Sequence, residues 1–337
     1  MNASVLRAAL AASLLAACSS SSPHVYVAGH EERTTAWVAM LWANGQPLPL
    51  DEEHSSTATG VAVAGGDVYV SGSVRFGPTS EAVYWKNGQV VRLTDGTREA
   101  WATDIAVAEG SVYVVGVEGA RAMVWKDGVP TPLTSGARQA VPEAIAVADA
   151  HVYVAGSEVE PVEVLPGTYE PAWVAKLWVD GVARPLTEAR TTRWAHATGV
   201  AVSGDDVHVS GLTTSSLHPD AHALAAVWNG GTLQALTDGT QPASAEAVAL
   251  AGSDVLVGGS VFDGTNDTPV IWKNGVALEV AHRFSTARVV ALATSGADVY
   301  AAGNDGGSAV LWVNGEPRPL SDGAVPAIGA AIAVVDR

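Results

Sequence analysis

Residues 82–93 read Ala-Val-Tyr-Trp-Lys-Asn-Gly-Gln-Val-Val-Arg-Leu, in which two apolar runs flank the pair Asn87-Gly88. Asn-Gly supplies the positive backbone φ angles that a two-residue hairpin turn requires. The stretch therefore predicts two short antiparallel strands joined by a tight turn, with Trp85 in the first of them.

This pairing of a tryptophan with a glycine-containing polar turn recurs through the chain of 337 residues. The seven copies are Trp42-Ala43-Asn44-Gly45, Trp85-Lys86-Asn87-Gly88, Trp125-Lys126-Asp127-Gly128, Trp178-Val179-Asp180-Gly181, Trp228-Asn229-Gly230, Trp272-Lys273-Asn274-Gly275 and Trp312-Val313-Asn314-Gly315. A second signature, Val-Tyr-Val-x-Gly or a near variant, begins at Val25, Val68, Val112, Val152, Val207, Val255 and Val299. Repeats of this length are typical of the blades of a β-propeller, so we predict seven blades.

Each repeat contains four strand-like segments. A run such as Val61-Ala62-Val63 is followed by the turn Gly65-Gly66-Asp67 and by Val68-Tyr69-Val70. Small turn residues between apolar runs indicate a hairpin, and the tryptophan hairpin supplies the third and fourth strands. The sequence therefore predicts an all-β fold with four-stranded antiparallel blades.

The two ends of the chain predict how the ring closes. The first repeat begins at its second strand, His24–Gly29, and an unpartnered first strand, Ala331-Ile332-Ala333-Val334, stands near the C-terminus. We expect the C-terminal strand to complete the first blade, because this closes the ring and removes an exposed sheet edge.

The seven repeated tryptophans are predicted to be core residues, since a large aromatic at one fixed place in every blade fills the space between neighbouring blades. The fifth unit, Trp228-Asn229-Gly230-Gly231, reads as one residue short of the pattern, which leaves the register of its turn open.

The N-terminal segment predicts export. Residues 1–17 carry Arg7 and then a short apolar run, which is typical of a signal peptide. The run ends Leu15-Ala16-Ala17-Cys18, which resembles the lipobox of bacterial lipoproteins and implies lipidation of Cys18. We divide the chain into a signal peptide at 1–17, a lipidated cysteine with a serine-rich tether at 18–23, and a propeller at 24–337. Ser19 follows the cysteine, and the resemblance to Gram-negative lipoproteins then implies the outer membrane.

Charge and missing motifs narrow the functional classes. Asp and Glu number 35 against 18 Lys and Arg, a formal net charge of −17, which repels polyanions and argues against nucleic acid as a partner. The sequence has no Gly-x-Ser-x-Gly elbow, no phosphate loop and no His-Glu-x-x-His. We therefore predict no catalytic residue, no metal site and no cofactor.

Over residues 24–337 the chain resembles bacterial secreted or lipoprotein β-propeller repeat proteins that carry a Trp-x-Asn/Asp-Gly hairpin in each blade. The resemblance is specific for architecture and implies no particular functional family.

Recognition is predicted on one face of the ring. The short hairpins emerge on one face, and the variable loops emerge on the other, where 157–172 and 212–224 are the longest. Two tryptophans outside the repeat lie in inter-blade loops, and exposed aromatics beside basic side chains are common at recognition surfaces. The candidate patch for a glycan or peptide comprises Arg98, Trp101, Arg193, Trp194 and His196. The alternative is that both tryptophans cap the core.

Acidic residues on the same predicted face keep an enzymatic alternative open. They are Glu31, Glu32, Asp51, Glu52, Glu53, Glu158, Glu160, Glu163, Glu170, Asp263 and Asp267. Two such carboxylates would serve a glycoside hydrolase or lyase, and the discriminating observation is a pair that converges in a pocket at the axis. The Asp263–Asp267 loop for calcium and His218 with His222 for zinc are weaker possibilities.

The leading hypothesis is a non-catalytic binding or scaffold lipoprotein of the bacterial cell envelope. It would be monomeric, held to the membrane by its lipid, and would recognise an envelope protein, peptide or glycan through the variable loop face. The alternatives are a propeller-type glycoside hydrolase or lyase, and a structural subunit of an envelope assembly.

Overall fold

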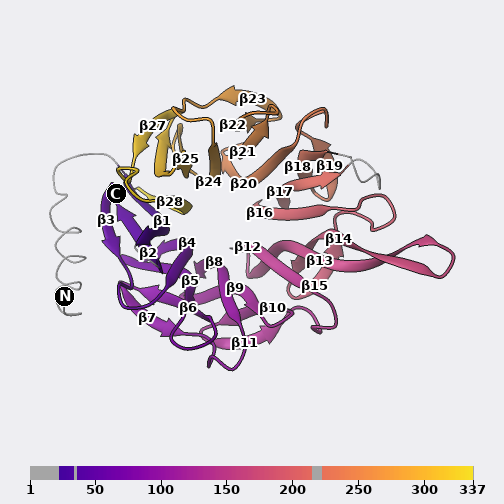
Figure 1. Cartoon of the computed structure of the whole chain (residues 1–337), viewed down its shortest axis with the longest axis horizontal. Helices are drawn as coiled ribbons and strands as arrows, with labels where there is room; N and C mark the ends of the chain where they lie inside the picture. The colour runs from indigo at the N-terminus through magenta and orange to yellow at the C-terminus, as the bar shows by residue number, and fades with distance from the viewer. Residues whose placement is uncertain (1–22, 34–35, 215–221, 337) are drawn as a thin grey trace.

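The computed structural model describes residues 23–33, 36–214 and 222–336, so the predicted signal peptide and Cys18 lie outside the described residues. The described residues form seven four-stranded sheets around a central axis, and every strand pair within a sheet is antiparallel (Figure 1). This confirms the predicted fold. Within these ranges no helix is long and apolar enough to cross a membrane.

The strands run in chain order from the inner to the outer edge of each blade, except in the first. Blade one contains β28 (Ala327–Val335), β1 (His24–Arg33), β2 (Ala36–Ala43) and β3 (Gln46–Pro49). Blades two to four contain β4 (Ser56–Ala64), β5 (Asp67–Val74), β6 (Glu81–Lys86), β7 (Gln89–Arg92), β8 (Ala100–Ala108), β9 (Ser111–Glu118), β10 (Arg121–Lys126), β11 (Val129–Pro132), β12 (Ala140–Ala148), β13 (His151–Leu165), β14 (Thr168–Val179) and β15 (Val182–Pro185). Blades five to seven contain β16 (Ala195–Ser203), β17 (Asp206–Thr214), β18 (Ala223–Asn229), β19 (Thr232–Ala235), β20 (Ala243–Ala251), β21 (Asp254–Phe262), β22 (Asp267–Lys273), β23 (Val276–Glu279), β24 (Ala287–Ser295), β25 (Asp298–Asp305), β26 (Ser308–Val313) and β27 (Glu316–Pro319).

The C-terminal strand closes the ring as predicted. β28 pairs with β1 from His24↔Val335 to Glu31↔Ala327, and it also contacts β24 of blade seven and β4 of blade two. The strand is longer than the predicted segment 331–334, but it occupies the predicted place. β28 is therefore the inner strand of blade one, as β4 is of blade two, and β1 is paired on both sides.

The repeated tryptophans form the core between blades. Each is at most 2% exposed, and each packs on the preceding blade, as Trp85 does against Leu41 and Trp125 against Ala82. Replacing a buried tryptophan by alanine typically costs about 3–5 kcal/mol, so these residues supply much of the cohesion between blades.

The Asn or Asp of each hairpin has a defined structural task. Asn87 adopts a φ of 51°, its amide N donates to Val68 O at 2.8 Å, and its Oδ1 accepts a hydrogen bond from Val68 N at 2.9 Å. The side chain therefore ties the outer hairpin to the second strand. The same side-chain bond is made by Asn44, Asp127, Asp180, Asn274 and Asn314.

Blade five corrects one interpretation of the sequence. Trp228 pairs with Leu233 as Trp85 pairs with Val90, so the fifth hairpin is full length and keeps the common register. Gly230, with a φ of 56°, occupies the turn position that Asn or Asp fills elsewhere. The asparagine of this unit directly follows the tryptophan, one position earlier than Asn87 in blade two, and this is why the motif reads as one residue short.

A β-bulge in each inner strand explains the glycine of the second signature. In blade two the register shifts between Ala58 and Gly60, which leaves Thr59 as the extra residue. A Cβ added at Gly72, on the neighbouring strand, would lie 1.9 Å from Thr57 O. Only glycine therefore fits beside the bulge, and the bulged residue is free to point to the axis.

Candidate functional site

The two faces of the ring differ as the sequence predicts. Asn87 at the outer turn donates to Asp67 beside the inner turn at 2.7 Å, so both tight turns of a blade lie on one face, which we call the hairpin face. The remaining connections emerge on the opposite face, which we call the loop face.

The prediction that residues 157–172 form a loop is wrong. Residues 157–172 belong to β13 and β14, which stay paired from Tyr153↔Val179 to Leu165↔Thr168. Their outer half, residues 159–172, extends well beyond the ring as a two-stranded ribbon, and we call it the arm (Figure 1). The other long connection, 212–224, is described only at its ends, and His218 lies outside the described residues.

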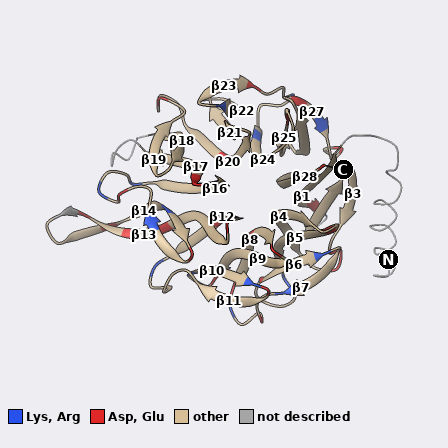
Figure 2. Cartoon of the chain, turned by 180° about the vertical axis from the view of Figure 1, so that it is seen from behind, with Lys and Arg blue, Asp and Glu red and all other residues tan. Residues whose placement is uncertain are grey.

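The base of the arm is fixed to the ring by charge. Lys176 is 7% exposed, and its Nζ lies 2.5 Å from Glu158 Oε2 and 2.7 Å from Glu160 Oε1. Burial lowers the pKa of Lys176, but the two carboxylates outweigh burial and raise it. Lys176 is therefore charged and holds both acids. Figure 2 shows blue and red segments close together on β13 and β14.

Blade five contributes a second attachment for the arm. Trp173 N donates to Arg193 O at 3.1 Å, and Arg193 Nη2 lies 2.5 Å from Glu170 Oε2. The segment that precedes β16 therefore packs against the base of the arm.

An aromatic cluster lies at this junction of blades four and five. The ring of His196 lies 5.1 Å from that of Trp173 and 5.9 Å from that of Trp194, and its Nδ1 lies 3.0 Å from Ser157 Oγ. Burial lowers the pKa of His196, so the ring is neutral at neutral pH. Trp194 is 52% exposed and offers an aromatic surface to solvent. We call Trp173, Trp194 and His196 the junction cluster.

The five candidate residues fall into two groups. Arg193, Trp194 and His196 gather at this junction, whereas Arg98 and Trp101 belong to blade three, with β12 of blade four between β8 and β16. Trp101 is 37% exposed, and Arg98 is exposed near Gly119. The candidate patch is therefore not continuous.

A cavity of about 180 Å³ lies on the axis of the ring. Its lining includes the bulged residue of every blade, namely Thr59, Thr103, Glu143, Thr198, Glu246, Val290 and Ala330. The three threonine hydroxyls donate to Ala102 O, Pro142 O and Ala245 O of the next blade at 3.0, 2.6 and 2.6 Å. Because a hydroxyl has one hydrogen, these groups present only acceptors to the cavity.

Two carboxyl groups of this axial cavity, those of Glu143 and Asp104, have raised pKa values. Burial, and then the charge of Glu246, raise the pKa of Glu143 to about 7. Burial raises the pKa of Asp104 to about 6, against hydrogen bonds from Ile145 N at 2.9 Å and Ile105 N at 2.8 Å. Asp104, Glu143 and Glu246 were not among the residues predicted from the sequence. An acidic residue inside an Ala-rich inner strand was the signal that could have identified them.

None of the predicted loop-face acids is among the residues that line the axial cavity. Glu31 and Glu52 pair with Arg33, Asp267 pairs with Arg288, and Asp263 accepts hydrogen bonds from its own loop at Thr265 N and Asn266 N. Within 23–33, 36–214 and 222–336, no group of three or more His, Cys, Asp or Glu side chains is arranged to hold a metal ion.

Comparison with known proteins supports the architecture. No protein-family model matches the chain, and no curated protein matches it. The β-propeller domain of the Trilobed protease from Pyrococcus furiosus is 11% identical with a TM-score of 0.54, and the match covers 89% of this chain and 97% of that domain. That domain has an open velcro topology, whereas β28 here pairs with β1.

The acylaminoacyl peptidase of Pyrococcus horikoshii is 13% identical with a TM-score of 0.52, and the match covers 88% of this chain and 50% of that one. The chain thus spans about half the length of this peptidase. At such identities the likeness shows the fold alone: the chain is a seven-bladed β-propeller.

Proposed function

We propose that this chain is a binding module of the bacterial cell envelope, anchored through a lipid on Cys18, that recognises an extended segment of a partner protein at the arm and the junction cluster. The observation that carries the proposal is the position of the half-exposed Trp194 beside the arm.

The arm suits an extended peptide. In the described part of the chain, the backbone ladders of residues 160–165 and 168–172 join these two segments only to each other, so each has an open edge. Open strand edges bind extended segments through main-chain hydrogen bonds, while side-chain pockets or aromatic surfaces confer specificity. Tyr169 on the arm is 61% exposed and adds a second aromatic surface.

Charge favours a basic segment. Glu163 and Glu170 lie on the arm, and the whole chain carries a formal charge of −17. A cationic partner segment would therefore be steered to this surface, with a dependence on ionic strength.

Photo-crosslinking in the native envelope tests the proposal. A photoreactive residue replaces Tyr169 in one variant and Val129 in another; Val129 is 65% exposed but lies on a different blade. We expect a discrete protein adduct from position 169, lost when Trp194→Ala is added and retained with Trp101→Ala. An adduct of equal strength from position 129, or none from position 169, would contradict the proposal.

A glycan array is the complementary experiment. Binding of a glycan that depends on Trp194, without any protein adduct at position 169, would replace the peptide by a saccharide and overturn the proposed partner class.

The axial carboxylates support the enzymatic alternative less well than the arm and the junction cluster support binding. Glu143 and Glu246 meet the expectation of two acids that converge in a pocket, and a carboxyl with a pKa of about 7 suits a general acid. However, a cavity of about 180 Å³ is smaller than the roughly 300 Å³ from which small-molecule sites begin, which leaves little room for a saccharide.

A further inference from the structure

Blade two shows how the hairpin face is normally filled between neighbouring blades. Lys86 Nζ lies 2.8 Å from Asp67 Oδ2 and 5.1 Å from the centre of the Tyr69 ring. Tyr69 is 7% exposed and lies in one buried cluster with Ile105 and Val114 of blade three, and its hydroxyl lies 3.5 Å from Asp67 Oδ2. A phenol ring therefore lies between the two blades beneath a lysine.

Blade three repeats part of this arrangement, since Lys126 Nζ lies 5.0 Å from the centre of the Tyr113 ring. A lysine at the end of the third strand thus covers the tyrosine of the second strand in two successive blades. The attraction between an ammonium group and an aromatic face stabilises such a pair.

Blade six keeps the polar part of the arrangement but lacks the ring. Lys273 Nζ lies 2.7 Å from Asp254 Oδ2, and Asn274 Nδ2 donates to Asp254 Oδ1 at 2.7 Å, as Asn87 does to Asp67. Leu256 pairs with Lys273 as Tyr69 pairs with Lys86, so leucine stands where blade two has its tyrosine.

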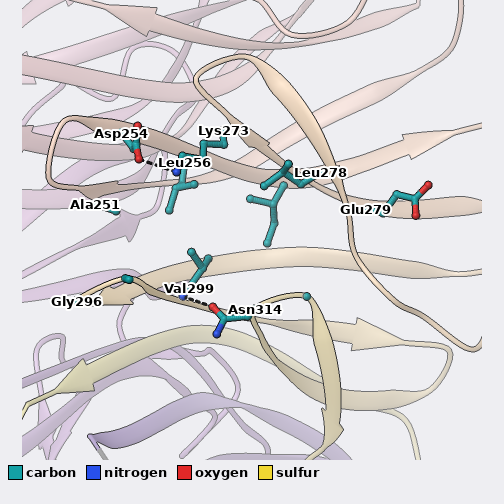
Figure 3. Close-up of a pocket in the computed structure, with 12 residues that line it drawn as sticks. Ala251, Asp254, Leu256, Lys273, Leu278, Glu279, Gly296, Val299 and Asn314 are labelled. Carbon is teal, nitrogen blue, oxygen red and sulfur yellow. Dashed lines mark hydrogen bonds and ion pairs between the residues drawn. The ribbon is translucent and has the colours of Figure 1, made fainter.

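A cavity lies where the ring is missing. It has a volume of about 490 Å³ and lies between blades six and seven on the hairpin face. Leu256, Leu278 and Val299 project into it, with Asp254 and Lys273 at one side (Figure 3). Val299 is the second residue of β25 in blade seven, as Val112 is of β9 in blade three. Because Val112 packs against the cluster that contains Tyr69, the matching wall is present here without the ring.

Hydrogen bonds fix the chain to blade seven beside the cavity. After β23 the chain leaves blade six, and Ala281 N donates to Gly315 O at 3.0 Å. Trp312 Nε1 also donates to Ala281 O at 2.7 Å. The segment that follows the lining residues Leu278 and Glu279 is therefore attached to blade seven.

We propose that this cavity binds a phenolic ligand, with the ring beneath Lys273 and between Leu278 and Val299, over the buried Leu256, and with the hydroxyl directed to Asp254. The ligand takes the place that the Tyr69 side chain takes in blade two. An apolar cavity of about 150 Å³ suffices for a benzene ring, so the volume of this one also admits a substituent on the ring.

Titration calorimetry with p-cresol, the analogue of a tyrosine side chain, tests the proposal on residues 19–337. We expect saturable binding at one site by the wild type. Leu256→Tyr should weaken it at least tenfold, because the new side chain fills the site, while its unfolding temperature stays equal to or above that of the wild type.

Two further comparisons keep the test independent of folding. Lys273→Met should weaken p-cresol binding about two- to fivefold, the size expected for an exposed cation–π contact, whereas the matched Lys86→Met in blade two should leave it unchanged. 4-Methylcyclohexanol, the saturated analogue of p-cresol, has a similar size but no aromatic face, and it should bind more weakly than p-cresol.

The proposal is overturned if the wild type does not bind p-cresol, if Leu256→Tyr binds it as well as the wild type, or if 4-methylcyclohexanol binds equally.

Discussion

Glu143 and Glu246 extend from the bulges of two inner strands into one axial cavity, and the negative charge of Glu246 contributes to the raised pKa of Glu143. In the described part of the chain, neither side chain forms an ion pair that would offset this repulsion. The fold therefore holds a carboxyl group whose proton is lost close to neutral pH.

The first prediction concerns stability and pH. The folded pKa of Glu143 is about 7 against an ordinary 4.5, so the native state keeps a proton that the unfolded state releases. The proton held by folded Glu143 therefore contributes fully to stability below pH 4.5, and this contribution is lost as the pH rises to 7. The free energy of unfolding should fall over this range by about 3 kcal/mol at most. We expect Glu143→Gln to be more stable than the wild type at pH 7.5 and to lose this advantage towards pH 4.5.

Urea unfolding at several pH values measures the difference between the two proteins. Glu53→Gln, at an exposed loop position, should differ from the wild type by a constant amount, and Glu246→Gln should lower the pH at which Glu143 titrates. A pH-independent difference for Glu143→Gln would refute the assignment.

The repeat made the fold predictable. Each hairpin signature is local chemistry, a positive φ at Asn87 and a side-chain bond to Val68 N, and seven copies leave few alternative architectures. The unpartnered strand near the C-terminus then fixed the closure, because β1 has an inner edge that only another strand can satisfy.

The sites were less predictable, because each depends on a departure from the repeat. Bulges interrupt the two-residue alternation of strands, so sequence spacing did not show that Glu143 points to the axis. The strands of the arm continue beyond the repeated motif, so the repeat gives no sign of them, and they contain Pro161 and Pro171, which pair with each other in β13 and β14. Proline is tolerated there because, among the described residues, neither strand pairs with a third strand at these positions.

The second prediction uses blade five, where Gly230 occupies the turn position of Asn87. Its φ is 56°, and an added Cβ would meet nothing within 4 Å. Gly230→Asn should therefore gain the missing bond to the amide of Val207 and stabilise the protein by about 1 kcal/mol. Gly230→Ala must adopt the same positive φ but has no side-chain acceptor, so the Asn variant should unfold at a higher temperature than the Ala variant. The reverse order would contradict the proposed role of the side chain.

The third prediction concerns the base of the arm. Lys176→Met leaves Glu158 and Glu160 facing each other without their cation, and we expect a loss of about 2–3 kcal/mol in the free energy of unfolding. Adding Glu158→Gln and Glu160→Gln should restore most of it. Lys126→Met, at an exposed hairpin position, should change stability by about 0.5 kcal/mol or less. If Lys176→Met behaves like Lys126→Met in guanidinium unfolding, the arm is held by other contacts.

The fourth prediction tests whether the closing strand is the weakest point of the ring. A Cβ at Gly29 would lie 1.9 Å from Ile328 O, and one at Gly156 would lie 2.3 Å from Val141 O, so both alanine variants force an inner strand away from its neighbour. In blade four the two strands are joined by a short turn and stay tethered, whereas β28 has no covalent link to β1 within the blade. Gly29→Ala should therefore lose about 3 kcal/mol or more and expose the amides of β28 and β1 to rapid hydrogen exchange. Gly156→Ala should lose less and leave exchange in β28 unchanged, so equal losses in the two variants, with β28 still protected in Gly29→Ala, would mean that the ring does not open at this strand.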